Sequence, residues 1–427
     1  MSPSIAILDR AALARLPVRY GPPLLALAMS PSKALGNLAL ILMLLAWLGR
    51  ARSSWPEFAG SAWGRWWLVF AAWLLLGAAL APALPAVGLT DHLRVAKDFM
   101  WVFLAVYVVA WAVTEGGHDG GRLLAWFVAG LLLSELLAVL RGGADWSVWS
   151  GAVRSGLAMY NPNTLGLYGG AALICLLLAG PDRLPGVRAP AALARGAWLL
   201  ALAAVAEALF VSQSRSAWLG LVVVLPPVLL LAFRRPAGRA VLVVGAVLLL
   251  ALLALNAGTV GARMAAEWET YRALWHGAGG AVPSADASGQ RIHMWRLGWQ
   301  AWTERPWTGW GAASAGPLLA ASEVASIRHH PHFHNMPLDV AVRSGLVGLL
   351  LVLGFFVLLF RAARGPNVPR VLAWTLTALL ALFLLDSLAT LLLLRNQGLF
   401  YLALCGGIAY SFEIRRRRTT APPPPRP

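Results

Sequence analysis

Long apolar segments recur along almost the whole chain, and short segments rich in Arg, Gly or Pro separate them. The apolar segments are continuous and rich in Leu and Ala, without the alternation that marks the strands of a membrane barrel. About 20 apolar residues suffice to cross a bilayer as a helix, and lipid requires a spanning backbone to satisfy its own hydrogen bonds. The pattern therefore predicts an all-α polytopic membrane protein. Its predicted spans are Ala34–Leu48, Trp66–Val87, His92–Val113, Leu123–Leu140, Leu157–Leu178, Ala197–Val211, Ala217–Phe233, Val241–Asn256, Met336–Phe360, Val371–Leu393 and Gly398–Phe412.

The distribution of arginine sets the expected orientation of these spans. Counting spans puts the Arg-rich connections on one side of the membrane, which the positive-inside rule makes cytoplasmic. The stretch Tyr20–Ser30 is either an interfacial helix or a further short span. A further span also places the N-terminal arginines in the cytoplasm, and it gives about 11–12 transmembrane helices in all. The Arg-rich connections are Arg50–Arg65, Arg183–Arg195, Arg234–Arg239, Arg361–Arg370 and Arg415–Arg418.

One connection, Gly258–Phe333, is far longer than the usual link between helices and falls on the outer side. Its stretch from Arg291 to Trp302 predicts a helix with aromatic residues on a broad face. Glu304-Arg305-Pro306 should end this helix, and Gly309 and Gly311 should form a turn. The expected organisation is N-terminal transmembrane helices over 1–256, a periplasmic loop domain containing helices over 257–333, C-terminal transmembrane helices over 334–413 and a cytoplasmic disordered tail over 414–427.

Composition agrees with a membrane protein and argues against several functions. Of 427 residues, 59% are hydrophobic and only 12% charged, about half the charged fraction of ordinary soluble domains. The net charge of +17 is scattered through short loops, so it fits topology better than nucleic-acid binding. Cys175 and Cys405 lie in separate apolar runs and suggest neither a disulfide framework nor a zinc site. The chain has no P-loop and no Rossmann glycine fingerprint, which disfavours a sugar-nucleotide donor.

Two arginines on the expected outer side are candidates for binding an anion. Arg215 directly precedes a span, where a charge near hydrocarbon is costly. Arg291 opens the aromatic helix of the long loop. Arg215 can be read as a snorkelling interface anchor, and Arg291 as a solvated residue at a helix end. Alternatively, two guanidinium groups on one membrane face could hold a pyrophosphate through bidentate, charge-assisted bonds.

A histidine-rich run, His329–Asn335, lies where the long loop re-enters the membrane. Its four histidines suggest a metal site, but no nearby acid or Cys completes a convincing ligand set. A structural role for His334 is a second reading. We favour His334 as a general base, because a neutral imidazole near pH 7 can take a proton from a sugar hydroxyl, with Asn335 in support. We expect no metal and no cofactor.

Other polar residues map to the same expected outer face. Asn161 and Asn163 flank a proline near the start of a span, where Asn-Pro favours a helix-start turn. Arg94 has the spacing to pair with Asp98 four residues later, which leaves Lys97 to face a donor phosphate or a lipid headgroup. These residues could support a site formed by the two arginines and His334.

Asp386 lies inside a predicted span, and Arg395 lies in the outer loop that follows it. An acid within the membrane is a functional candidate by default. We nevertheless expect a structural tie between Asp386 and Arg395.

Three stretches together resemble the O-antigen ligases and related bacterial lipid-linked glycan polymerases. Ser214–Gly220 is similar to the Ser-Arg or Gly-Arg start of a span in that family. Arg291–Trp295 and Pro306–Gly311 resemble its periplasmic arginine helix and its Pro-x-x-Gly-x-Gly turn. The most diagnostic match is His334-Asn335 followed after nine residues by Gly345–Gly348. The layout of spans, with one large outer loop before the last of them, extends the resemblance to the whole chain.

The resemblance implies a metal-independent glycosyltransferase of the bacterial inner membrane with its active site facing the periplasm. Direct displacement at the anomeric carbon would invert its configuration, which we expect because there is a single candidate base and no paired carboxylate to act as nucleophile. The donor would be O-antigen on undecaprenyl pyrophosphate, and the acceptor the lipid A–core of lipopolysaccharide. His334 would activate the acceptor hydroxyl, and Arg215 and Arg291 would stabilise the pyrophosphate. Leu349-Leu350 follows Gly348 where many ligases carry a Thr pair, which keeps a polymerase and a protein O-oligosaccharyltransferase open. A transporter or flippase for anionic lipids is the alternative of another class, although we see no convincing internal repeat.

Overall fold

The computed structural model describes residues 10–85, 87–142, 155–157, 161–180, 190–233 and 287–420, with the single positions 258, 261, 265, 268 and 272. In these residues every named element is a helix, as the sequence predicts. The elements are α1 (Arg10–Ala28), α2 (Lys33–Gly49), α3 (Ala51–Gly60), α4 (Ala62–Ala79), α5 (Leu89–Glu115), α6 (Gly120–Leu140), α8 (Pro162–Ala179), α9 (Ala191–Ser212), α10 (Arg215–Phe233), α13 (Ala287–Glu304), α14 (Ala315–Ala320), the short 3₁₀ helix η3 (Ala325–Ile327), α15 (Met336–Ala363), α16 (Arg370–Ser387) and α17 (Asn396–Thr420).

Within the described residues, seven helices are long and apolar enough to cross a membrane: α4, α5, α6, α8, α9, α15 and α16. The pair α2 and α3, bent by 99°, adds an eighth if it counts as one broken span. The segment Tyr20–Ser30 begins inside α1, whose proline residues Pro17, Pro22 and Pro23 interrupt its hydrogen bonding. The expected span Val241–Asn256 lies outside the described residues. The all-α polytopic fold is therefore confirmed, while the count of 11–12 spans stays a prediction.

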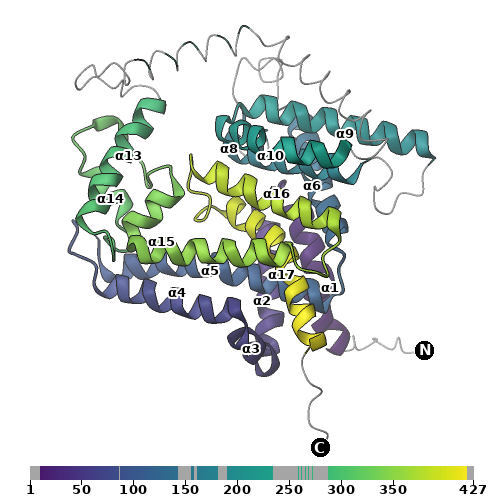
Figure 1. Ribbon diagram of the computed structural model, residues 1–427, viewed down its shortest axis with the longest axis horizontal. Helices are drawn as coiled ribbons and strands as arrows, with labels where there is room; N and C mark the ends of the chain where they lie inside the picture. Colours follow the sequence, from purple (N-terminus) through teal and green to yellow (C-terminus); the bar gives the residue numbers. More distant parts are fainter. Residues whose placement is uncertain are drawn as a thin grey trace, which may run out of the picture.

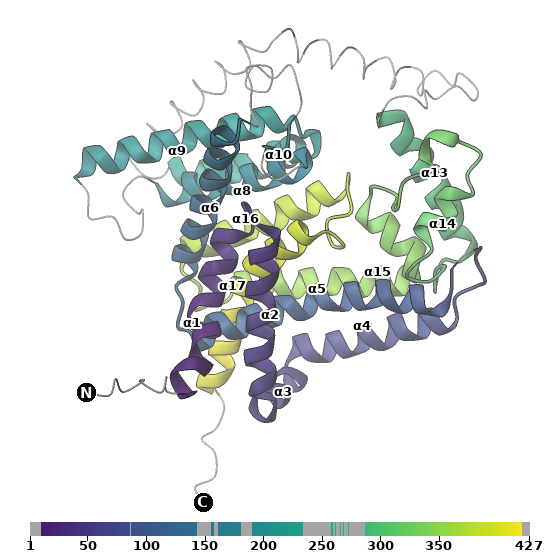
Figure 2. The ribbon, with the colours of Figure 1, turned by 180° about the vertical axis from the view of Figure 1, so that it is seen from behind.

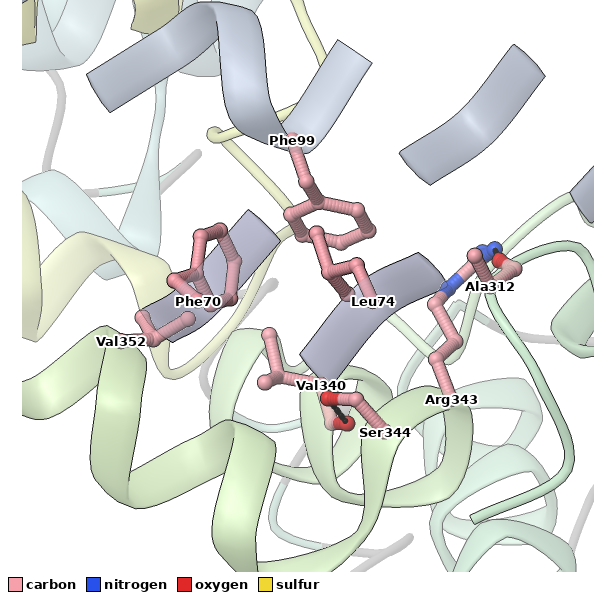
Figure 3. Close-up of a pocket in the computed structure, with 8 residues that line it drawn as sticks. All are labelled: Phe70, Leu74, Phe99, Ala312, Val340, Arg343, Ser344 and Val352. Atoms are coloured by element: carbon pink, nitrogen blue, oxygen red, sulfur yellow. Dashed lines mark hydrogen bonds between the residues drawn. The ribbon is translucent and has the colours of Figure 1, made fainter. Parts of the chain in front are cut away.

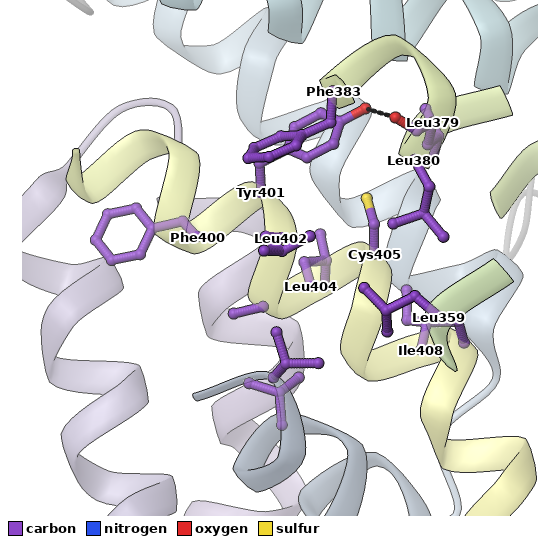
Figure 4. Packing of buried hydrophobic residues seen from close by; sticks show 14 of the residues in the cluster. Leu359, Leu379, Leu380, Phe383, Phe400, Tyr401, Leu402, Leu404, Cys405 and Ile408 are labelled. Atoms are coloured by element: carbon purple, nitrogen blue, oxygen red, sulfur yellow. Dashed lines mark hydrogen bonds between the residues drawn. The ribbon is translucent and has the colours of Figure 1, made fainter. Parts of the chain in front are cut away.

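The centre of the bundle is formed by α5 and α17, which pack along each other and are buried over most of their length. Gly406 and Gly407 of α17 let the backbones approach, because any side chain there would press on Val106 and Val109 of α5. Small residues at helix contacts are typical of membrane bundles. Figure 4 shows the neighbouring contact, in which Tyr401 of α17 donates a hydrogen bond of 3.0 Å to the carbonyl of Leu379 on α16.

Arginine gathers at one end of the molecule, which we call the basic end and define by Arg50 and Arg415–Arg418. Arg50 pairs with Glu115 at 2.7 Å, and Arg418 pairs with both Glu57 and Glu115 at 2.7 Å. In Figures 1 and 2 the start of α1 and the end of α17 lie on this side, and α13 and α14 lie on the far side, which we call the loop end. The expected disordered tail from 414 instead begins as the last turns of α17, which runs to Thr420 because its arginines pair with neighbouring acids.

A glycine turn attaches the long loop to α15. Gly309 and Gly311 have φ of 69° and 91°, as expected for a turn, and Gly345 in α15 has φ of 68° and breaks the helix. The two irregular segments bond to each other: the amide of Leu346 donates to the carbonyl of Pro306 at 2.7 Å, and Trp310 donates to Val342 at 2.8 Å. A Cβ at Gly345 would collide with the carbonyl of Trp307, so the contact requires glycine.

The opposite side of the α15 break is held by α4. Trp73 donates a hydrogen bond of 2.9 Å from its indole Nε1 to the carbonyl of Ser344, and Trp66 does the same to Leu351 at 2.8 Å. A broken helix leaves carbonyls without partners, which is costly inside a membrane unless neighbours satisfy them. The break in α15 is thus stabilised by hydrogen bonds from α4, and it fixes the position of the loop end of the bundle.

Candidate functional site

The histidine run forms a tight turn between η3 and the start of α15. Asn335 caps α15, its side-chain oxygen accepting the amide of Leu338 at 3.0 Å. His334, directly before the cap, has φ of 52°, in the left-handed region that a residue with a side chain rarely adopts. Strained residues of this kind persist where the surroundings hold them, and they cluster at functional sites.

A buried ion pair on α15 supplies this support. Asp339 and Arg343 pair one helical turn apart and are both almost fully buried. The carboxylate of Asp339 also accepts the amide of Phe333 at 2.9 Å. Arg343 donates to the carbonyl of Pro331 at 3.2 Å and to that of Ala312. The pair therefore ties the histidine turn to the glycine turn.

Figure 3 shows Arg343 reaching toward Ala312 at the edge of a small pocket whose other walls are mainly apolar. Asp339 and Arg343 were not among the site residues predicted from the sequence. A signal was available, because an acid and an arginine four residues apart at the start of a span can pair along one helix face, and such charges are tolerated near the membrane only when they are paired.

The two ring nitrogens of His334 lie in different surroundings. Its Nε2 lies 3.3 Å from Nδ1 of His330, whereas its Nδ1 is buried and has no hydrogen-bond partner in the described part of the chain. Its backbone amide donates to Nδ1 of His332 at 3.2 Å. The pKa of His334 is lowered to about 2. Burial is the largest cause, and the neighbouring His332, Arg291, His330 and Arg395 contribute to the same lowering. The imidazole is therefore neutral at pH 7.

A sharp connection between α9 and α10 places Arg215 against the start of α13. Gln213, with φ of 44°, ends α9, and the hydroxyl of Ser212 accepts the amide of Ser214 at 3.2 Å. Arg215 then opens α10 and donates from Nη1 to the hydroxyl of Ser288 at 3.0 Å. Ser288 lies in the first turn of α13, so this hydrogen bond joins α10 to the long loop.

Arg291 follows Ser288 by three residues on α13 and so lies on the same helix face, one turn further on. Its charge acts on His334 from one side and on Asp386 of α16 from another. The structure thus joins Arg215 to α13 one turn before Arg291, whose charge acts on His334. The three residues come from different elements of the chain.

Asp386 is fully buried at the end of α16, and neither of its carboxylate oxygens has a hydrogen-bond partner among the described residues. Ser216 and Arg291 are close enough to act on it electrostatically. The expected tie between Asp386 and Arg395 is wrong: Arg395 instead places Nη2 3.3 Å from Nε2 of His332. The reason is that the segment between α16 and α17 turns Arg395 toward the histidine turn.

The remaining sequence candidates have more local roles. Asn161 caps α8, accepting the amides of Asn163 and Thr164 at 2.9 and 3.4 Å, which is the expected helix-start turn. Asn163 in turn accepts a hydrogen bond of 3.4 Å from the hydroxyl of Ser214, next to Arg215. It therefore links α8 to the site.

Arg94 and Lys97 lie exposed near the start of α5. Arg94 pairs with Asp91 at 3.4 Å, and not with Asp98 as expected. Asp98 pairs with Lys97 instead, also at 3.4 Å. Both ion pairs are exposed and stay within α5, so the structure does not tie either cation to the histidine turn.

Across the described ranges, no three His, Cys, Asp or Glu side chains are grouped so as to hold a metal ion. The histidine turn is instead a network of ring contacts. The ring centroids of His332 and His334 are 4.1 Å apart, those of His330 and His334 5.1 Å apart, and those of His329 and His330 4.2 Å apart.

Comparison with known proteins agrees with this geometry. No curated protein matches the chain. A sequence model of the family described as O-antigen ligase matches residues 199–353. The matched segment begins in α9 and ends in α15, so it contains the Arg215 turn, α13, the glycine turn and the histidine turn. Over residues 199–353, about a third of its length, the chain is thus similar to the O-antigen ligase family.

Proposed function

We propose that the protein is an O-antigen ligase that transfers a glycan from undecaprenyl pyrophosphate to a sugar hydroxyl of lipid A–core. The reaction would take place on the periplasmic face of the inner membrane. The observation that carries the proposal is that Arg215 of α10 bonds to α13 one turn before Arg291, whose charge acts on the buried, neutral His334. This combination provides donors for a diphosphate and a base for an alcohol in one place.

The chemistry requires one bond to form and one to break at the anomeric carbon. As the acceptor oxygen attacks, its proton passes to His334, and the bond from the anomeric carbon to the diphosphate oxygen breaks with its electron pair. Negative charge then grows on the departing diphosphate, where Arg215 and Arg291 would stabilise it. A direct displacement of this kind inverts the anomeric configuration. A double displacement would need a carboxylate nucleophile, and Asp386, on which the charge of Arg291 acts, is fully buried at the end of α16.

Membrane position supports a lipid-carried donor. The candidate site lies at the loop end, opposite the basic end. The positive-inside rule assigns the basic end to the cytoplasm, which leaves the candidate site facing the periplasm. The candidate spans α15 and α16 and the shorter apolar helix α10 contribute to the site or carry its neighbours. A diphosphate held at the lipid headgroup level could therefore reach the arginines without leaving the membrane.

The proposal is tested by reconstituting the protein in proteoliposomes with an undecaprenyl-pyrophosphate-linked glycan and lipid A–core. We expect covalent joining of glycan to core, detected as a shift on a lipopolysaccharide gel and by mass spectrometry. Elongation of the lipid-linked glycan without joining would indicate a polymerase, joining to an added protein a protein O-oligosaccharyltransferase, and translocation without a new bond a flippase. Treatment with a chelator should leave joining unchanged, and loss that added metal restores would contradict a metal-independent reaction.

A further inference from the structure

The histidine turn contains a second histidine, His330, whose role the proposed reaction leaves open. Its ring lies between two partners from different parts of the chain. Nδ1 of His330 lies 3.3 Å from Nε2 of His334, and its Nε2 lies 3.4 Å from the side-chain oxygen of Gln290 on α13. The three side chains thus form a line from α13 to His334.

The direction of the hydrogen bonds along this line follows from the chemistry of the groups. The amide oxygen of Gln290 can only accept, so His330 must carry its proton on Nε2. A neutral imidazole has one donor and one acceptor nitrogen, so Nδ1 of His330 accepts a hydrogen bond. Nε2 of His334 must then donate it, and the lone pair of His334 is left on Nδ1. That nitrogen is the one that is buried without a partner in the described residues.

We propose that Gln290 and His330 are positioning residues that fix His334 in the tautomer whose Nδ1 takes the proton of the acceptor hydroxyl. The inference rests on the proposed glycosyl transfer. It assigns the role of base to Nδ1 of His334. The hydrogen-bonded line from Gln290 through His330 to His334, which we call the relay, fixes the tautomer and carries no proton. The same logic operates wherever a third group orients a catalytic base by accepting a hydrogen bond from the N–H on the far side of its ring.

The proton balance of the step is simple. The O–H bond of the acceptor breaks and an N–H bond forms at Nδ1 of His334, which becomes a cation. Its Nε2–H continues to donate to His330, which gains no proton but stabilises the new charge with its lone pair. After transfer, the proton on Nδ1 leaves to water and the original tautomer is restored. Removing His330 would let the His334 ring adopt the other tautomer, in which Nδ1 carries a proton and cannot act as a base.

The groups that surround the relay favour a neutral partner over an acid. Arg291 acts on His334 from α13 and Arg395 from the α16–α17 connection. Asp339 and Arg343 of α15 act on the neighbouring His332. A carboxylate in place of His330 would attract the same arginines that the diphosphate needs. A histidine fixes the tautomer without competing for them.

The first test compares two replacements of His330 in the reconstituted transfer assay. His330→Leu removes the acceptor, and we expect kcat to fall about 10- to 100-fold, by analogy with the loss when the outer partner of a metal-binding histidine is removed, with KM for the donor unchanged. His330→Gln keeps an oxygen acceptor and should recover most of kcat. Glu323→Gln, at an exposed position of the same loop, is the control and should keep wild-type activity. Equal losses in the Leu and Gln variants, or no loss in either, would overturn the relay.

The second test changes the far end of the relay and reads the pH profile. Gln290→Glu places a carboxylate on His330, which makes the His330–His334 unit more basic. The acidic limb of kcat should therefore move to higher pH, a shift that a merely structural role of Gln290 would not produce. An unchanged limb in an active Gln290→Glu variant would contradict the proposal.

The third test does not depend on activity. The protein labelled with ¹⁵N-histidine is placed in nanodiscs, and the His334 signals are identified by their loss in His334→Gln. We expect the proton of His334 on Nε2 in the wild type, and a mixture of tautomers in His330→Leu. A proton on Nδ1 in the wild type would refute the relay even if the protein transfers glycan. The expected tautomer in a protein that transfers no glycan would leave the geometry intact and refute the proposed function instead.

Discussion

His334 combines a strained backbone, burial and an unpartnered ring nitrogen in a single residue. Replacing it with Ala removes the only base that we assign to the reaction, and general-base catalysis contributes about 10²- to 10⁴-fold. We expect His334→Ala to reduce glycan joining by at least that factor while the protein inserts and folds normally. The measurement is initial rate in proteoliposomes, with His329→Ala as the matched control and melting temperature as the check on folding. Full activity in His334→Ala would remove the base from the proposal.

The pKa of His334 makes a prediction about pH. Burial first, and then the nearby charges that include Arg291 and Arg395, lower it to about 2 in the free protein. A bound diphosphate would offset the arginine charges, so we expect donor binding to raise this pKa. Consequently kcat/KM, which reports the free protein, should stay flat as pH falls through 6.5, and the acidic limb of kcat should lie at higher pH. An acidic limb of kcat/KM centred near pH 6.5 would show that the pKa of His334 is not lowered in the free protein, and would contradict the prediction.

The effect of replacing Arg215 or Arg291 should depend on the shape of the guanidinium group as well as on its charge. Arg215→Ala and Arg291→Ala should each lower kcat/KM for the donor about 10²- to 10³-fold, the usual loss when one donor to a developing anion is removed. Lys should restore only part of the loss, because it lacks the planar fork that binds two phosphate oxygens. Arg94→Ala, which removes an exposed arginine paired within α5, is the control. Wild-type donor kinetics in both Ala variants would show that Arg215 and Arg291 do not bind the diphosphate.

At the scale of elements, the buried pair Asp339–Arg343 holds the histidine turn on α15. Asp339→Asn leaves Arg343 buried without its counter-ion, and breaking such a pair costs about 3–5 kcal/mol. Asp98→Asn breaks an exposed pair with Lys97 on α5, worth about 0–1 kcal/mol. We therefore expect a clear drop in melting temperature in detergent for the first variant and almost none for the second. Equal melting temperatures would show that the pair does not support the turn.

The helices and turns were predictable from the sequence where their cause lies in the residues of the same segment. Apolar length predicted most spans, and Pro306, Gly309 and Gly311 predicted the end of α13 and its turn, since these residues restrict or free their own backbone. Asn161 was likewise predictable as a helix cap. The pairing of charges was not, because the partner of Arg395 or Asp386 depends on how α16 and α17 meet the histidine turn. Spacing alone wrongly paired Arg395 with Asp386.

At the scale of the whole molecule, the proposal depends on which side of the membrane each end faces. Cys175 and Cys405 are buried, so a cysteine introduced at an exposed position can be labelled selectively. Glu323→Cys lies exposed at the loop end, near the histidine turn, and Thr419→Cys lies exposed at the basic end. If arginines retain the basic end in the cytoplasm, a membrane-impermeant maleimide added to cells with a permeabilised outer membrane should label residue 323 and not residue 419. Opening the inner membrane should then expose both. Labelling of residue 419 in cells with an intact inner membrane would turn the histidine turn toward the cytoplasm, where a periplasmic acceptor could not meet it.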